Sequence, residues 1–234
     1  MGKLAIIGFL VLTLVVAEVI SLLQLRASLT SNAQYWQQRI SQPGELTYVA
    51  LGDSAAQGIG ASRPQNGYVG VIAGRLAQKT GKTIRVVNLS VSGAKLQDVI
   101  DKQIPQLKNY QPDFVTIEAG ANDMVAFDAA NFRTRFNVLV EQLPAITIVA
   151  NMPNFGGRVK RVQAVNSAND IIKQACASAH LAEADLYTAT KSHESPLNYA
   201  ADFFHPSNRG YKNWADAFWK ILNSSNSSDS SDSK

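Results

Sequence analysis

The alternation of strand-like and helix-like segments constrains the fold of this 234-residue chain more than any other feature. Five short apolar, partly β-branched runs have the profile of buried strands, at residues 46–51, 84–89, 114–118, 146–150 and 184–187. Helical patterns follow them, at residues 68–79, 96–107, 131–141, 159–179 and 206–222. In the last of these, Pro206 suits a first helical position. Strict alternation predicts an α/β protein, a three-layer α/β/α sandwich around a five-stranded parallel sheet.

The segment TYVALGDSAAQGIG, residues 47–60, places a short polar sequence directly after the first predicted strand. Open α/β sheets bind their ligands at the carboxyl ends of the strands. Ser54 is therefore a candidate nucleophile, and Gly52 permits a sharp turn and the close approach of a substrate. On this segment alone, Ser54 serves equally well as a cap for the helix that follows.

Polar blocks also follow the other predicted strands. They are NLSVSG at 88–93, GAND at 120–123, NMPNFG at 151–156 and DFFHP at 202–206. Each block alone carries little information, because Asn, Gly and Asp are common in turns. Since the carboxyl ends of parallel strands open onto one edge of a sheet, four such blocks together with Ser54 predict a common site.

Asp202 and His205 are the most informative pair in these blocks. Three residues apart at the start of a helix, the carboxylate can accept the Nδ1 proton of the imidazole and fix its tautomer. The other ring nitrogen is then free to take the proton of Ser54. The alternative is that Asp202 only caps the last helix and that His205 is a surface residue.

Four of the blocks resemble those of the SGNH/GDSL hydrolase family in order and spacing. The matching residues are Gly52-Asp53-Ser54, Gly93 within NLSVSGA, Gly120-Ala121-Asn122-Asp123, and Asp202-Phe203-Phe204-His205-Pro206. The resemblance covers about residues 46–222 and implies a flavodoxin-like sandwich. Two positions depart from the family pattern, which bears on the shape of the pocket. Ala55 stands where the family name has leucine, and Ser90 where the second block often has glycine.

The resemblance implies that Ser54 is the nucleophile and that Asp202 and His205 complete a catalytic triad. It also implies an oxyanion hole formed by the backbone N–H groups of Ser54 and Gly93 and the side chain of Asn122. The activity implied is carboxylic ester hydrolysis, of the esterase or lipase type, through an acyl-enzyme. Two alternatives are an acyltransferase or deacetylase acting on envelope glycans or lipids, and an inactive binding module on the same fold.

The substrate is less well defined than the chemistry. Met152, Phe155 and Phe203 suggest an apolar acyl-binding site, walled by loops at residues 61–67, 151–157 and 188–201. We expect a small-molecule, lipid or glycan ester. The spacing of Asp53, Asp123, Asp202 and His205 matches no metal-ligand motif, so we expect neither a metal nor a cofactor.

The two ends of the chain differ from its body. Residues 4–25 are apolar apart from Thr13, Glu18, Ser21 and Gln24, and as a helix they would rise about 33 Å, enough to cross a bilayer core. We interpret residues 1–25 as a signal anchor or a signal peptide, with the catalytic domain membrane-anchored and extracytoplasmic, or secreted after cleavage. We expect a stem at residues 26–45, helical to about Ile40, followed by the hydrolase domain at residues 46–222. We expect a disordered tail at residues 223–234.

The composition excludes some classes of function. With 46% hydrophobic and 17% charged residues the chain is globular, and its net charge of +4 is spread along the sequence. Because no basic run is interleaved with aromatic residues, we expect no nucleic-acid partner. The single cysteine, Cys176, excludes an internal disulfide and any cysteine metal cluster.

Overall fold

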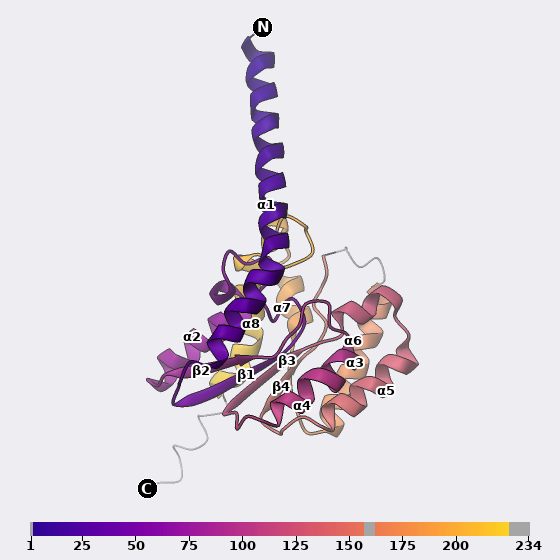
Figure 1. The fold of residues 1–234 in the computed structure, drawn as a ribbon. Coiled ribbons are helices and arrows are strands. Elements are labelled where there is room, and N and C mark those ends of the chain that lie inside the picture. The colour runs from indigo at the N-terminus through magenta and orange to yellow at the C-terminus, as the bar shows by residue number, and fades with distance from the viewer. Residues whose placement is uncertain (1, 157–161, 225–234) are drawn as a thin grey trace.

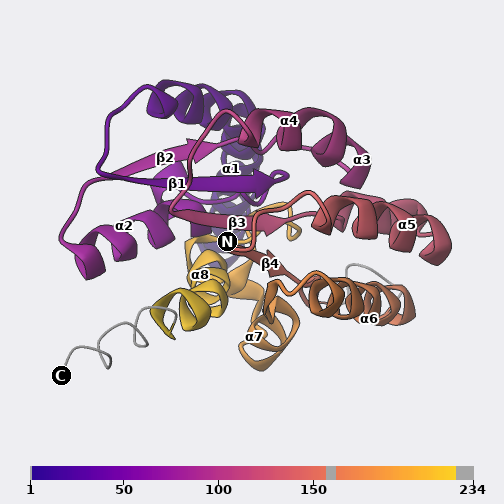
Figure 2. The same ribbon diagram turned by 90° about the horizontal axis from the view of Figure 1, so that it is seen from below.

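The computed structural model describes residues 2–156 and 162–224. A five-stranded, fully parallel sheet forms its centre, in the order β2-β1-β3-β4-β5. The strands are β1 Leu46–Gly52, β2 Ile84–Asn88, β3 Phe114–Glu118, β4 Thr147–Ala150 and β5 Ala182–Ala184. Helices cover both faces of the sheet (Figures 1 and 2), which confirms the predicted three-layer α/β/α sandwich. Most of the predicted tail lies outside the described residues.

The two faces of the sheet carry separate cores. On one face, β-branched side chains of β1 and β3 pack under α5 (Ala129–Val140), α6 (Val162–Ser178) and the helical segment at residues 96–107. That segment comprises α3 (Leu96–Asp98), a π-helical turn (Val99–Gln103) and α4 (Ile104–Leu107). On the other face, α2 (Tyr68–Thr80), α7 (Leu186–Ser192) and α8 (Asn208–Ser224) cover Tyr48, Ala50 and Ile148. The start predicted for α6, at residue 159, lies outside the described residues.

Several predicted element boundaries are wrong, and the clearest errors lie at the fifth strand and the last helix. The fifth strand ends at Ala184 rather than Tyr187, because the Asp185 side chain accepts the Thr188 N–H and caps α7. Pro206 does not begin the last helix: it pairs with Tyr199 in an isolated antiparallel bridge. The helix begins at Asn208, and the hydroxyl of the preceding residue, Ser207, accepts the Gly210 N–H of its first turn.

The long helix α1 (Gly2–Ile40) joins the sheet through its last third. Trp36 and Asn32 are buried and donate to the carbonyl oxygen of Gln57, which follows β1. Ile40, at the other end of the contact, accepts from Arg85 near the start of β2. The helix therefore runs antiparallel to the strands and leaves the domain at their carboxyl edge (Figure 1).

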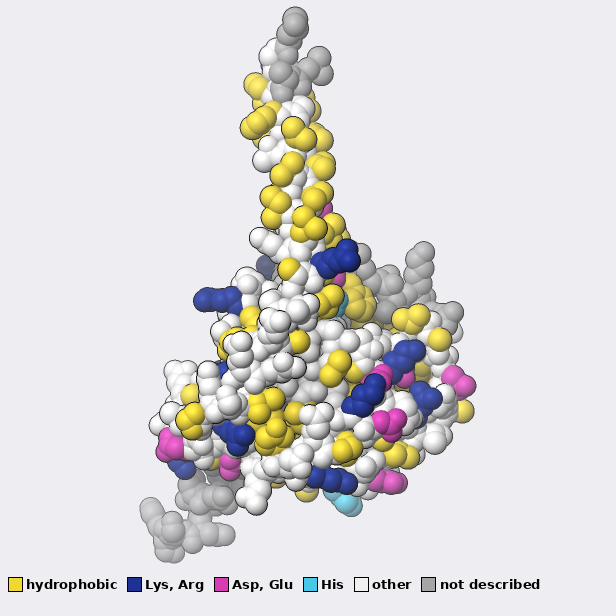
Figure 3. Space-filling model, viewed as in Figure 1, with side chains coloured by type: hydrophobic (Ala, Val, Ile, Leu, Met, Phe, Trp, Pro, Cys, Tyr) yellow, Lys and Arg dark blue, Asp and Glu magenta, His cyan; other side chains and the backbone are white. Residues whose placement is uncertain are grey.

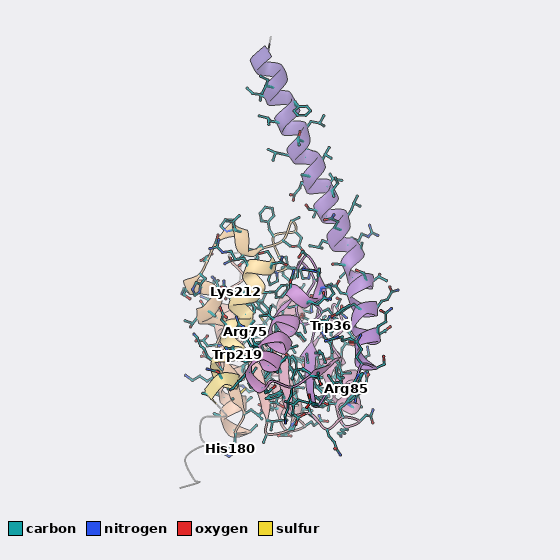
Figure 4. The ribbon with its side chains drawn as sticks, turned by 90° about the vertical axis from the view of Figure 1, so that its left-hand side faces the viewer. Trp36, Arg75, Arg85, His180, Lys212 and Trp219 are labelled. Carbon is teal, nitrogen blue, oxygen red and sulfur yellow. The ribbon has the colours of Figure 1, made fainter. Side chains whose placement is uncertain are left out.

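Beyond the domain, α1 exposes apolar side chains along its length (Figure 3), and from Ile6 onward it is long and apolar enough to cross a membrane. A signal sequence near the amino terminus would have the same properties. Figure 4 shows Trp36 on the side of α1 that faces the domain, and Arg85 near the end of the helix. His180 lies at the opposite edge of the sheet from the emerging helix.

Candidate active site

Ser54, His205 and Asp202 form a continuous hydrogen-bonded chain at the carboxyl edge of the sheet. The Ser54 Oγ lies 3.0 Å from His205 Nε2, and His205 Nδ1 lies 2.5 Å from Asp202 Oδ2. The second oxygen of Asp202 accepts the backbone N–H groups of Phe204 and His205, each at 3.0 Å. Residues separated by about 150 positions in the sequence thus meet in the arrangement of a nucleophile, a base and a group that orients the base.

The electrostatics of Asp202 suit this orienting role. Burial acts to raise the pKa of Asp202, but the hydrogen bond with His205 and the backbone N–H groups outweigh it and lower the pKa overall. The carboxylate therefore stays ionised through the neutral range and can hold the proton of His205 on Nδ1. Nε2 is then the ring nitrogen available to accept the Ser54 proton.

The turn that presents Ser54 depends on a glycine at position 52. Gly52 has φ +141°, and a Cβ there would lie 2.1 Å from the Glu118 carbonyl oxygen of the neighbouring strand. Its backbone N–H and C=O groups are both bonded to the side-chain amide of Gln103, at 2.9 and 2.8 Å. The π-helical turn ends at Gln103, which is buried. The side chain of Gln103 thus provides hydrogen-bond partners for the last backbone groups of β1, where the sheet ends.

A second glycine permits the approach of the histidine loop. At Gly60, with φ +93°, a Cβ would lie 2.6 Å from the Pro206 carbonyl oxygen and 2.8 Å from the His205 Cβ. Only a residue without a side chain lets the loop after β1 and the loop before α8 come this close. The distance between Ser54 and His205 is set in part by this contact.

Asn122 lies beside the nucleophile and is held by two acceptors. Its Nδ2 donates to Asp53 Oδ2 at 2.9 Å and to the Ala94 carbonyl oxygen at 3.0 Å. The second acceptor brings the loop that carries Gly93 next to Asn122. Within the described part of the chain, the backbone N–H groups of Ser54 and Gly93 donate to no protein acceptor. The two backbone N–H groups are therefore available to a ligand, whereas both Nδ2 hydrogens of Asn122 are already engaged.

A cavity opens beside these groups. Ser54, Asn122 and His205 line it together with Asp53 and Glu118, and Phe155, Phe204, Pro153 and Trp214 provide apolar walls. The ring of Phe204 stacks on Phe155 with 6.4 Å between centroids and meets the His205 ring edge-on at 5.0 Å. No cluster of three or more His, Cys, Asp or Glu side chains that could hold a metal occurs among the residues the structure describes.

Comparison with known proteins identifies the family of the chain. The model of the GDSL-like lipase/acylhydrolase family matches residues 50–212, well over half of the chain. The chain belongs to this family. No curated protein matches the chain.

Solved structures share the fold at low sequence identity. TesA has a TM-score of 0.66 at 20% identity, over 75% of this chain and 97% of its own. The lipase/acylhydrolase from Enterococcus faecalis has a TM-score of 0.64 at 21% identity, over 76% and 95%. A variant of Axe2, an acetyl xylan esterase from Geobacillus stearothermophilus, has a TM-score of 0.63 at 21% identity, over 76% and 94%. These likenesses support the fold of the GDSL-like domain.

The structure distributes the three predicted acyl-binding residues differently. Phe155 lines the cavity as expected. Met152 does not: its side chain is completely buried in the core beneath α5 and α6, and its backbone N–H is bonded to Asn169. Phe203 is 44% exposed and is not among the described residues that line the cavity, whereas its neighbour Phe204 is. Phe203 has φ +51°, so the chain turns there and reverses which phenylalanine faces inward.

Sequence reasoning missed Glu118, a buried residue that lies beside the polar groups of this GDSL-like site. Glu118 lies at the end of β3, opposite Gly52, and is completely buried beside Asp53. As a carboxylate it would have no hydrogen-bond donor among the described residues. Burial first, and then the charge of Asp53, raise the pKa of Glu118 well above its ordinary value. The neutral form of the Glu118 carboxyl is therefore favoured beside Asp53, the acceptor that holds Asn122.

Replacing Glu118 with glutamine should reduce the loss of stability that accompanies a rise in pH. Because the folded chain keeps the Glu118 proton that the unfolded chain loses, wild-type stability falls as pH rises above the unfolded pKa. Glutamine is neutral at every pH, so the variant should gain on the wild type by up to about 1.4 kcal/mol per pH unit. Urea unfolding between pH 5 and pH 8 measures this slope. Glu141→Gln, at an exposed position after α5, is the control; parallel profiles for Glu118→Gln and the wild type would contradict the assignment.

Proposed function

We propose that this chain is a serine ester hydrolase that works through an acyl-enzyme and is held at a membrane by α1. The single observation that carries the chemistry is the relay from Ser54 Oγ to His205 Nε2 at 3.0 Å and from His205 Nδ1 to Asp202 at 2.5 Å. Membership of the GDSL-like lipase/acylhydrolase family supports the same reaction class. A complete relay next to an open cavity disfavours a purely binding role.

The proposed reaction has two halves. Ser54 Oγ attacks the ester carbonyl carbon while His205 Nε2 takes its proton, and the carbonyl oxygen becomes an oxyanion. When the carbon–oxygen bond to the alcohol breaks, Nε2 returns the proton to the leaving oxygen, and the acyl group remains on Ser54. A water molecule then attacks the acyl carbon with the same base, and the products are a carboxylic acid and the free serine.

Asn122 and the backbone N–H groups of Ser54 and Gly93 are the proposed oxyanion donors. Both Nδ2 hydrogens of Asn122 are engaged, by Asp53 and by the Ala94 carbonyl oxygen, so an oxyanion must share one of them. These contacts fix the orientation of the amide before the substrate arrives. Such pre-organisation is what makes a donor effective in the transition state.

Asn122→Ala should lower kcat by about 10²–10³, the usual cost of one oxyanion donor, with a much smaller change in KM. Steady-state hydrolysis of p-nitrophenyl acetate measures this split. Asn109→Ala, in the turn after α4 and away from the cavity, is the matched control. A kcat within threefold of wild type would remove Asn122 from the proposed donors.

Covalent labelling tests the nucleophile. A fluorophosphonate should modify the native chain once, and peptide mass spectrometry should place the adduct on Ser54 rather than on Ser90 or Ser92. Ser90 and Ser92 lie in the neighbouring loop, but their hydroxyls donate to the side-chain amides of Asn88 and Gln57, which are not bases. An adduct on either of them, or no adduct at all, would overturn the proposal.

The proposed membrane attachment rests on the length and apolar character of α1. Ser31 and Ala33 offer the small residues that a signal-peptide cleavage site requires at positions −3 and −1. Cleavage after Ala33 would remove the two hydrogen bonds of Asn32, so the burial of Asn32 and Trp36 against the loop after β1 supports an uncleaved helix. We propose an uncleaved anchor with the catalytic domain on the extracytoplasmic side. Carbonate extraction of membranes containing the full chain, with intact-mass measurement, distinguishes an anchor from a cleaved signal.

A further inference from the structure

The direction of α1 relative to the sheet determines which side of the domain faces the membrane. The helix contacts the loop after β1 through Asn32 and Trp36 and continues past the carboxyl edge, where Ser54 and His205 lie. Arg26, at the end of the apolar segment, is six residues before Asn32, which corresponds to a rise of about 9 Å. A lipid headgroup layer is about 5–7 Å thick. An anchored chain would thus hold its catalytic edge close to the headgroups.

Exposed apolar side chains are concentrated at this same edge. Between residues 46 and 224, eight large apolar side chains are exposed in the described structure. Val91, Val125 and Val162 come between a strand and the body of the helix after it, where the strand reaches this edge. Leu197, Phe203 and Phe204 lie in the loop between α7 and α8, which also carries His205 to Ser54. Val125 and Leu197 are 83% and 69% exposed. Figure 3 shows apolar side chains on both sides of the point where α1 leaves the domain.

The other two exposed apolar residues provide a contrast. Ile146 precedes β4 at the amino edge of the sheet, and Val138 lies near the end of α5. Scattered apolar side chains are normal on any protein surface, whereas a set gathered on one edge marks an interaction surface. The position of the anchor says which surface would meet this edge.

The cavity connects the edge to the nucleophile by an apolar path. Phe204 is 43% exposed at the edge, lines the cavity and stacks on Phe155, which lines the cavity beside it. An acyl chain leaving a bilayer at this edge would therefore meet aromatic surface up to Ser54 and would not have to cross water.

We propose that the catalytic edge lies against the bilayer in which α1 is embedded and that the substrate is an acyl ester of an amphiphile resident in that bilayer. This inference rests on the proposed anchor and the proposed hydrolase activity. The rim residues Val125 and Leu197 contact the lipid surface, and the cavity takes the acyl chain from it.

Depth measurement tests the orientation without relying on activity. Val125→Cys and Leu197→Cys, each carrying a bimane label, are reconstituted as full chains in vesicles of phosphatidylcholine and phosphatidylglycerol at 3:1. Cys176 is buried and its thiol has a pKa raised by burial to about 12, so the label goes to the introduced cysteine. Lipids with a nitroxide near the headgroup should quench both labels at least threefold more than a label at Ile146→Cys, the matched site on the opposite edge.

The outcomes separate this inference from the function on which it rests. Chains that do not float with the vesicles would overturn both the anchor and the orientation. Chains that float but show equal quenching at the two edges would overturn the orientation alone. Labelling of Ser54 by a fluorophosphonate in the same samples reports the hydrolase separately.

A spacer in the helix tests the source of the substrate. Seven helix-forming residues inserted after Arg26 keep nearly the same helical phase and raise the catalytic edge by about 10 Å. Turnover of a long-chain ester embedded in the vesicles should fall at least tenfold, while turnover of soluble p-nitrophenyl acetate should stay the same. The same seven residues added before Gly2 are the control. An unchanged rate on the embedded ester would overturn the proposed source.

Discussion

Ser54→Ala should reduce kcat/KM for p-nitrophenyl acetate by at least 10⁴, about 5.5 kcal/mol of transition-state stabilisation. The hydroxyl lies 3.0 Å from His205 Nε2 and is the only serine oxygen within the described structure that a histidine–aspartate pair contacts. Its removal leaves no atom to carry the acyl group, and only the oxyanion donors and the cavity remain to assist direct attack by water. Such remnants still accelerate hydrolysis by about 10³–10⁴ over water, so the activity should be small but measurable.

The control for this variant is Ser192→Ala, an exposed serine at the end of α7. It should keep the wild-type rate. Thermal unfolding of both variants shows whether a lost rate reflects lost structure. A folded Ser54→Ala protein with a rate within tenfold of wild type would mean that another group attacks the ester.

Asp202→Asn should lower kcat by about 10⁴ while leaving the fold intact. The oxygen of the new amide can still accept the backbone N–H groups of Phe204 and His205, so the loop keeps its shape. Its NH₂ group would then face His205 Nδ1, which must become an acceptor. The proton therefore moves to Nε2, and the ring can no longer take the proton of Ser54.

Asp216→Asn is the matched control, because Asp216 is a half-exposed carboxylate on α8 that pairs with Arg75. It should change the rate by less than twofold. If Asp202→Asn retained more than a tenth of the wild-type kcat, Asp202 would act only as a loop residue. The base would then be oriented by another group.

The fold was predictable because parallel α/β proteins give strong signals in the sequence. Buried strands appear as short apolar runs, and each crossover requires a helix, so the order of elements determines the architecture. The errors lie where local side-chain bonds decide. Asp185 ends the fifth strand by capping α7, and Ser207 moves the start of α8 past Pro206. Both depend on capping hydrogen bonds that hydrophobic periodicity does not detect.

The site was predictable to the extent that it depends on residues with distinctive chemistry. Ser54, Asp202 and His205 meet as the sequence suggests, and Asn122 lies beside them. The cavity walls were harder to predict, because the direction of a side chain depends on one backbone angle: the positive φ of Phe203 makes Phe204 the inward-facing ring.

The buried residues that support the site, Glu118 and Gln103, could not be recognised from the sequence. Glu118 reads as an ordinary residue at the end of a strand, and Gln103 as an ordinary residue in a helix. Only the packing shows that one is buried against Asp53 and that the other holds both backbone groups of Gly52. Their roles arise from contacts between segments far apart in the sequence, which periodicity and spacing do not encode.

The hydrogen bonds between α1 and the loop after β1 have a consequence for any shortened form of this protein. The carbonyl oxygen of Gln57, three residues past Ser54, accepts from Asn32 and Trp36, and that of Gly58 accepts from Asn32 as well as from Ala61. A protease that freed the domain by cutting after Trp36 would remove these hydrogen-bond donors. The segment that positions the Ser54 hydroxyl would then be less rigidly held. Shedding from the membrane and loss of catalytic power would then be one event, and a fully active soluble enzyme must begin ahead of Asn32.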